Sequence, residues 1–298
     1  MQVILDNDPS PSSIEGCAAT IGVYDGVHLG HQAVIRATQA EAARHGVPTA
    51  VVTFDRHPAT VLRPENAPLQ LTTLEQKLEL LELAGVECTF VVHFDEERAK
   101  ESAEDFVAEV LVGRLHARSI VVGEDFHFGH QRRGNVAFLR EVGLDHGFTV
   151  EGLSLLPSPA GVAEPVSSTA IRRSLAGGDV SAAAAMLGRS YELRGIVVQG
   201  DQRGRLLGFP TANIPVPSAM GYPPTPSTPA GTSVPTAAAT RRPSTSGGDR
   251  PSTSTPTRRC SRRTSSTSPT TSTARRPGSS SSGCSARRCA STASRRSS

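Results

Sequence analysis

The stretch AATIGVYDGVHLGHQAVI, residues 18–35, predicts the first structural unit of this chain and the place of its site. Residues 18–23 form a short apolar run that is typical of a buried strand. A helix is predicted from about Leu29 to His45, where Gly46 closes it. The apolar run TAVVTF, residues 49–54, predicts a second strand. Together these segments predict a β-α-β unit.

The same alternation of strands and helices continues along the chain. Apolar runs predict strands at 88–94, 119–123 and 148–156, and amphipathic patterns predict helices at 73–84, after Ser102 and at 135–145. Two short helices are predicted within 167–188. Because the strands are almost continuously apolar, we expect a parallel sheet with helices on both faces. The predicted fold is therefore a Rossmann-like α/β domain.

A change of pattern after residue 188 predicts a second domain. Residues 191–214 read as strand and Gly-rich turn, which predicts the start of a β-type domain. We place the domain boundaries at 1–188, 189–220 and 221–298. The last of these segments differs from both of the others in composition.

Residues 221–298 contain 20 Ser, 15 Thr, 13 Arg and 10 Pro among 78 residues, with one acidic residue and no Lys, Leu, Ile, Phe or Met. This tail carries a net charge of +12, whereas residues 1–220 carry −9, so the basic character of the whole chain, +3, comes from the tail. So few aliphatic side chains cannot offset an ordering entropy of about 1–2 kcal/mol per residue. The composition predicts disorder.

The N-terminus MQVILDNDPS lacks the charged and apolar regions of a signal peptide, and no apolar stretch approaches the ~20 residues of a membrane span. We therefore predict a cytoplasmic protein with no membrane partner. The basic tail leaves open a nonspecific nucleic-acid-binding arm; no specific nucleic-acid partner is expected.

Two histidines, His28 and His31, lie where the first helix begins, directly after a strand and two glycines, Gly22 and Gly26. In a doubly wound sheet, ligands bind at the carboxyl ends of the strands, where helix N-termini attract phosphate. Imidazoles three residues apart on a first turn converge on one anion. This arrangement predicts phosphoryl or nucleotidyl transfer by positioning and charge stabilisation.

Two other interpretations of these histidines remain open. They are helix-capping or surface residues in the simplest one. In the other they are zinc ligands, but His57, His127 and His130 are scattered and no Cys pair accompanies them.

Four motifs give a more specific resemblance: GVYDGVHLGHQAVI (22–35), TFDRHP (53–58), VVGEDFHFGHQRRG (121–134) and SSTAIR (167–172). In this order they resemble the FAD synthetase domain of bacterial bifunctional riboflavin kinase/FAD synthetases. The HxGH element alone is shared with other nucleotidylyltransferases, so the flavin assignment depends on the other three motifs. The resemblance implies adenylyl transfer from ATP to FMN, with Mg²⁺ on the phosphates.

The resemblance also implies roles for individual residues. It implies catalytic roles for His28, His31 and Arg172. The nucleotide side would comprise Gly22, Val23, Tyr24, Asp25, Gly30, Asp125, Ser168 and Thr169. The flavin side would comprise Thr53, Phe54, His57 and Pro58. Tyr24, Arg56 and Asp125 differ from the residues that the family usually has.

Residues 195–214 resemble the opening of a riboflavin kinase domain, in which Thr211 and Asn213 of the PTAN element would help to bind a magnesium nucleotide. The family's barrel needs about a hundred further residues and a catalytic Glu, but this sequence has no Glu after Glu192. A one-base shift of GC-rich codons for Val-Asp-Val gives Ser-Thr-Ser, which recurs at 244–246 and 252–254. We therefore predict a frameshift, lost phosphorylation of riboflavin and retained FAD synthesis. An inactive binding remnant is the non-enzymatic alternative.

Overall fold

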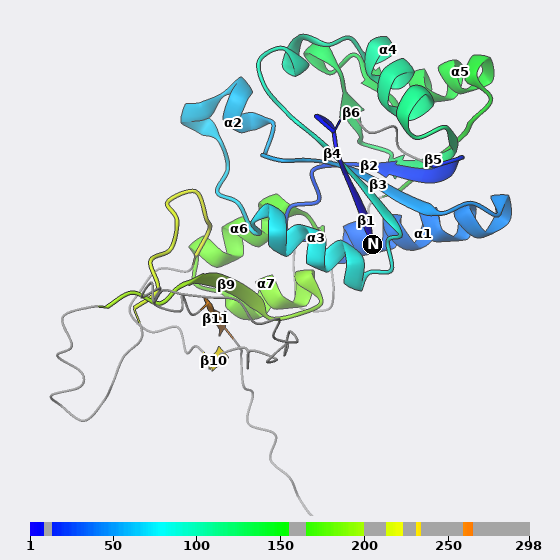
Figure 1. Cartoon of the computed structure of the whole chain (residues 1–298). Coiled ribbons are helices and arrows are strands. Elements are labelled where there is room, and N and C mark those ends of the chain that lie inside the picture. The colour runs from blue at the N-terminus through cyan, green and yellow to red at the C-terminus, as the bar shows by residue number, and fades with distance from the viewer. Residues whose placement is uncertain (9–13, 155–164, 200–212, 223–230, 234–258, 265–298) are drawn as a thin grey trace, which may run out of the picture. The chain divides into compact units, whose positions relative to one another are not determined.

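The computed structural model describes residues 1–8, 14–154, 165–199 and 213–222, together with the backbone of 231–233 and 259–264. Its main feature is a six-stranded sheet in the order β1-β4-β3-β2-β5-β8, in which every neighbouring pair is parallel (Figure 1). The strands are β1 Gln2–Leu5, β2 Cys17–Ile21, β3 Thr49–Phe54, β4 Cys88–Val92, β5 Ala117–Gly123 and β8 Thr149–Leu153. The predicted parallel α/β fold is confirmed.

Helices cover both faces of this sheet. On one face, α4 (Ala103–Phe106), the π-helix η3 (Val107–Arg114) and α5 (Val136–His146) pack on residues such as Val52 and Phe90. On the other face, α1 (Leu29–His45) and α3 (Leu74–Leu83) pack around Val51. Neighbouring residues of one strand thus point to opposite cores, which is why the strands are apolar throughout.

The predicted helix boundaries follow local capping chemistry. Gly46 ends α1 in the left-handed conformation, with a φ of 64°, where glycine lacks the steric penalty of other residues. Thr73 and Gln76 form both hydrogen bonds of a capping box at the start of α3. Asn135 caps α5 by accepting a hydrogen bond from the N–H of Phe138.

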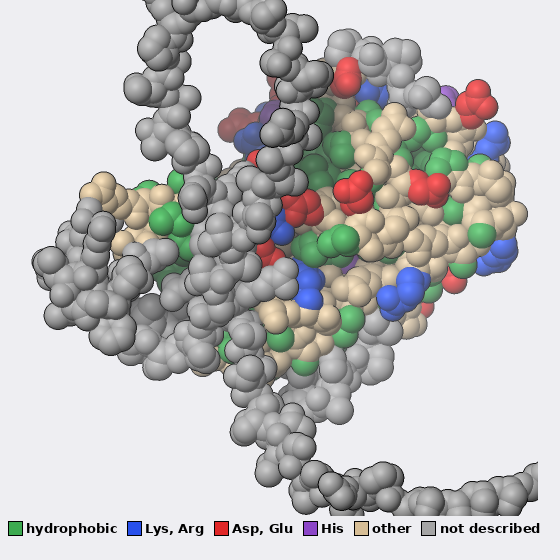
Figure 2. Space-filling view, turned by 60° about the horizontal axis from the view of Figure 1, so that its bottom comes forward, with side chains coloured by type: hydrophobic (Ala, Val, Ile, Leu, Met, Phe, Trp, Pro, Cys, Tyr) green, Lys and Arg blue, Asp and Glu red, His purple; other side chains and the backbone are tan. Residues whose placement is uncertain are grey.

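Smaller elements complete the described chain. They are α2 (Ala59–Leu62), η1 (Pro64–Asn66), η2 (Arg98–Lys100), η4 (His130–Arg132) and the short hairpin β6 (His127–Phe128) with β7 (Gly134–Asn135). Near the site lie α6 (Ser168–Ala176) and α7 (Val180–Leu187), the two short helices that the sequence predicts. On the face shown in Figure 2, acidic and basic side chains are interspersed.

A second, three-stranded sheet has the antiparallel order β10-β11-β9. The strand β9 (Tyr191–Ile196) lies where the sequence predicts a β-type domain, whereas β10 (Gly231–Ser233) and β11 (Arg259–Thr264) lie in the segment for which it predicts disorder. For these nine residues the structure describes strands instead. The strand β11 pairs with β9, and β10 pairs with β11; both pairings are made by the backbone and need no apolar side chains. The rest of the tail lies outside the described residues.

Candidate active site

The loop between β2 and α1 carries the predicted nucleotide-binding residues at the carboxyl edge of the sheet. Its backbone adopts positive φ angles at Tyr24 (54°), Gly26 (84°) and Val27 (39°). Such angles are unusual for the branched side chain of Val27 and require support from the surroundings. Gly22 is needed for space, because a Cβ there would lie 3.1 Å from the Tyr24 ring.

Asp25 supplies much of that support. Its buried carboxylate accepts hydrogen bonds from the backbone N–H groups of Leu71 (2.9 and 3.1 Å) and Thr72 (3.0 Å) and from the Thr72 hydroxyl (3.2 Å). Its fourth partner is the guanidinium of Arg172. The carboxylate therefore joins the loop to the chain before α3 and to α6.

His28 and His31 lie together at the start of α1. Their rings stack with centroids 3.6 Å apart and an interplanar angle of 17°. The Nδ1 of His28 accepts the N–H of His31 at 3.3 Å, so the neutral ring carries its hydrogen on Nε2. Gly30 allows this position, because a Cβ there would lie 3.1 Å from the His28 ring. The structure thus brings the two imidazoles together, and their convergence on an anion stays a prediction.

Both histidines are neutral at pH 7. Burial, together with the charges of Arg189 and Arg172, lowers the pKa of His28 to about 4. Burial and the neighbouring His28, Lys77 and Arg189 lower the pKa of His31 well below its usual value. In the described part of the chain, the buried Nδ1 of His31 has no hydrogen-bond partner. A neutral imidazole donates one hydrogen bond, which suits a phosphate oxygen.

The N-terminus of α6 packs against the same loop. Ser168 donates from its hydroxyl to the backbone oxygen of Asp25 at 2.9 Å, and Ser167 caps the helix by accepting the N–H of Ala170. Arg172, one turn further on, is bound to Asp25 and to the carbonyl of Leu69. Thr169 is exposed. The structure thus brings the SSTAIR segment to the HxGH loop, as the sequence predicts.

The predicted flavin side adjoins the loop at the end of β3. The Thr53 hydroxyl donates to the carbonyl of Val23 at 3.0 Å. His57 accepts the N–H of Ala59 on its Nδ1, and Pro58 precedes α2. Burial and the charge of Arg172 lower the pKa of His57. A pocket lies between the two sides, lined by Val23, Asp25, Asp55, Arg56, His57, Gln70, Thr72, Leu74 and Lys77.

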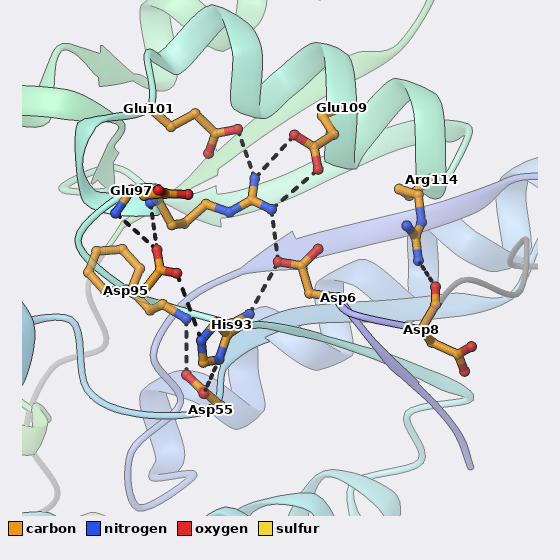
Figure 3. Close-up of polar contacts among 11 residues, drawn as sticks. Asp6, Asp8, Asp55, His93, Asp95, Glu97, Glu101, Glu109 and Arg114 are labelled. Atoms are coloured by element: carbon orange, nitrogen blue, oxygen red, sulfur yellow. Dashed lines mark hydrogen bonds and ion pairs between the residues drawn. The ribbon is translucent and has the colours of Figure 1, made fainter.

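A network of charged groups includes Asp55, one of the residues that line the pocket (Figure 3). Asp55 accepts hydrogen bonds from the ring of His93 (2.8 Å) and from the N–H of Phe94 (3.1 Å). Arg98 joins Asp6, at the end of β1, to Glu101 and Glu109. These contacts fix Asp55, which lines the pocket.

Not every predicted site residue joins this cluster. Asp125 follows β5 with an exposed side chain, and no described contact ties its carboxylate to the HxGH loop. Thr211 lies outside the described residues. The side chain of Asn213 is exposed, and its carbonyl accepts the N–H of Val198 at 2.8 Å.

Two cations of the site were not predicted from the sequence. Lys77 lies buried on α3 and donates to the backbone of the loop. Arg189 donates to the carbonyls of Gly26 (2.6 Å) and Val27 (3.2 Å). A lysine in an amphipathic helix gives no sequence signal of burial. The place of Lys77 becomes evident only once α3 is packed on the sheet.

The described residues do not form a dedicated metal site. None of their His, Cys, Asp and Glu side chains group in threes in a way that could hold an ion. The Asp25 carboxylate is already bound by N–H groups and Arg172. These residues fit Mg²⁺ that arrives on the phosphates of ATP, which is its usual mode of binding.

A parallel sheet with stacked histidines at the first helix N-terminus defines the class of HxGH nucleotidylyltransferases. The comparisons with known proteins give the family. This chain belongs to the FAD synthetase family, whose model matches residues 10–170. A family model described as riboflavin kinase matches residues 187–232. This match ends twelve residues beyond the predicted boundary at 220.

Curated relatives agree with this assignment. The chain is 40% identical over 214 residues to a bifunctional riboflavin kinase/FMN adenylyltransferase of Haemophilus influenzae, covering 72% of this chain and 68% of the relative. It is 38% identical to the protein of the same name from Escherichia coli K12, covering 68% and 64%. The match thus spans about two thirds of these relatives.

A solved structure shares the fold at 26% identity. It is titled as a macrolide-efflux protein from Streptococcus pneumoniae and aligns with a TM-score of 0.68 over 79% of this chain and 76% of that one. Among the described helices of this chain, none has both the length and the apolar character that crossing a membrane requires.

Proposed function

We propose that this chain transfers AMP from ATP to FMN, giving FAD and pyrophosphate. A phosphate oxygen of FMN forms a bond to the α-phosphorus of ATP, while the bond from that phosphorus to the bridging oxygen of pyrophosphate breaks. The observation that supports this most is the stacked pair of neutral histidines of the HxGH element at the start of α1. The names of the curated relatives support the same reaction.

The residues of the site have distinct roles in this proposal. His28 donates from Nε2–H to a phosphate oxygen, and His31 lies stacked against it with one further donor. Arg172 exchanges its ion pair with Asp25 for a phosphate, to which a guanidinium binds in bidentate fashion. Mg²⁺ on ATP neutralises phosphate charge when it is bound. Binding and alignment by this chain supply the rest.

Incubation of the full chain with FMN and Mg-ATP, followed by chromatography, tests the proposal. We expect FAD and pyrophosphate in equal amounts. Transfer of AMP only to phosphopantetheine or to nicotinate mononucleotide would identify another nucleotidylyltransferase. Binding of flavin without any product, or salt-sensitive RNA binding alone, would identify an inactive remnant.

We also propose that the chain does not phosphorylate riboflavin. Thr211 and Asn213 are present in the sequence, but no Glu follows Glu192, and the riboflavin kinase match ends at residue 232. We expect no FMN from riboflavin and Mg-ATP. Sequencing of the coding DNA should show that a one-base change near the codons for residues 220–226 restores Glu-containing strands, and the repaired chain should make FMN. FMN formation by the chain as it stands would refute this proposal.

A further inference from the structure

Lys77, on α3, connects the nucleotide side of the site to its flavin side. Its ammonium group donates to the carbonyl of Val23 at 3.1 Å, to the hydroxyl of Thr53 at 3.1 Å and to the carbonyl of Phe54 at 2.7 Å. Val23 belongs to the nucleotide loop, and Thr53 and Phe54 end β3 on the flavin side. One side chain from α3 thus holds both backbones.

All three acceptors are uncharged oxygens, and together they use every hydrogen of the ammonium group. A neutral amine has two hydrogens and a lone pair, so it can donate to only two of these three oxygens. The Val23 carbonyl also accepts the Thr53 hydroxyl at 3.0 Å. The contact set is therefore complete only when Lys77 is charged.

We propose that Lys77 is a positioning residue that sets the spacing between the nucleotide and flavin sides of the site. The proposal rests on the proposed transfer of AMP to FMN, in which an oxygen on one side attacks a phosphorus on the other. Reacting atoms need to approach to about 3–3.5 Å, and a 1 Å displacement of either substrate lowers the rate by about 10²-fold. Lys77 lies at the point where such a displacement would begin.

The surroundings of Lys77 give the proposal a pH dependence. Its side chain is 6% exposed, and burial lowers its pKa to about 8, against the opposing effects of Asp25 and Asp55. The other titratable groups that interact electrostatically with Lys77 are His31 and His57. Their pKa values are lowered, so both rings are already neutral when the pH reaches 8. One of the three hydrogen bonds should therefore be lost as the pH rises through about 8.

This chain offers a clean measurement, because it contains only two lysines, Lys77 and the exposed Lys100. Lysine labelled with ¹³C at Cε should give two signals in an NMR titration of the full chain. We expect the Lys77 signal to titrate near pH 8. The K100M variant assigns the two signals. The FAD-forming activity should fall along the same curve as the Lys77 signal.

Variants complete the test. We expect K77M to lower kcat by about 10²-fold, with KM for each substrate changed less than threefold, and K100M to match the wild type. The K77R variant should keep more activity than K77M and lose the alkaline decline. If K77M does not fold, the wild-type titration and pH profile still decide. A kcat of K77M equal to the wild type, or a Lys77 signal that titrates without any change in rate, overturns the role of Lys77. A wild-type chain that forms no FAD overturns the proposed function, and the role of Lys77 with it.

Discussion

Replacement of Asp25 by Ala should be among the most destabilising single changes in this chain. The Asp25 side chain is 6% exposed and binds two buried backbone N–H groups, one hydroxyl and one guanidinium. Each backbone donor that loses its partner in a buried position costs about 1–3 kcal/mol. Breaking a buried ion pair costs about 3–5 kcal/mol when the remaining charge stays buried.

These costs are not additive, because Arg172 keeps its bond to the Leu69 carbonyl and its side chain is 16% exposed. We therefore expect D25A to lower the free energy of unfolding by about 3–5 kcal/mol, and D25N by less, because an amide oxygen still accepts one N–H. Urea titration of the full chain, followed by far-ultraviolet circular dichroism, measures this change. The slope against urea should stay constant.

The control is Asp179, an exposed carboxylate that caps α7 by accepting the N–H of Ala182 at 2.9 Å. Loss of such a cap costs about 1 kcal/mol. If D25A loses no more stability than D179A, the Asp25 contacts do not hold the loop, and the reasoning from them is refuted.

Three further predictions follow from the loop. H28A and H31A should each lower kcat by about 10²-fold, as when one transition-state donor is lost; unchanged turnover in both would leave the histidines as capping residues. His28 has a pKa of about 4 in the folded chain, and an unfolded His has a pKa near 6.5, so the unfolded chain binds more protons between these two values. The free energy of unfolding should therefore fall by about 3 kcal/mol as the pH drops from 6.5 to 4. Urea titrations at several pH values should show a shallower fall for H28Q. G26A should lose more stability in such titrations than the control G147A, because both glycines have positive φ but only at Gly26 would a Cβ approach Leu71, to 2.9 Å; equal losses would contradict the role of that contact.

The sheet and its helices were predictable because their signals are local. The apolar run 49–54 coincides with β3, and the Thr73–Gln76 pair forms the expected capping box. Glycines at the ends of α1 and α5 take the left-handed conformation that the sequence favours there. Short-range sterics and hydrogen bonding determine each of these features.

Features that depend on tertiary contact were not predictable in this way. The short strand β1 carries little pattern of its own and forms by pairing with β4. The positive φ angle of Val27 contradicts its local preference and occurs beside carbonyls that Arg189 binds. The amphipathic pattern at 73–84 predicts a helix but not that Gln76 and Lys77 are buried beside Leu81 on α3. Lys77 turns inward here because the carbonyls of Val23 and Phe54 supply acceptors.

The acceptors of the loop also explain why its charged neighbours come from distant parts of the chain. Asp25, in the loop, binds the N–H groups of Leu71 and Thr72, whereas Lys77 and Arg189 donate to carbonyls of the loop. Such preorganised groups stabilise a transition state without moving during the reaction.

The hydrogen bonds from Arg189 to the carbonyls of Gly26 and Val27 cross the predicted domain boundary at 188. Tyr191, Leu193 and Met220 pack in one cluster with residues of α6 and α7, and Arg189 holds the loop carbonyls. A cut after residue 188 removes both sets of contacts from the nucleotide side. The fragment 1–188 should therefore unfold at lower urea than the full chain and turn over more slowly, even though it contains all the predicted catalytic residues. The first residues after the predicted boundary thus hold the loop of the proposed adenylyl-transfer site.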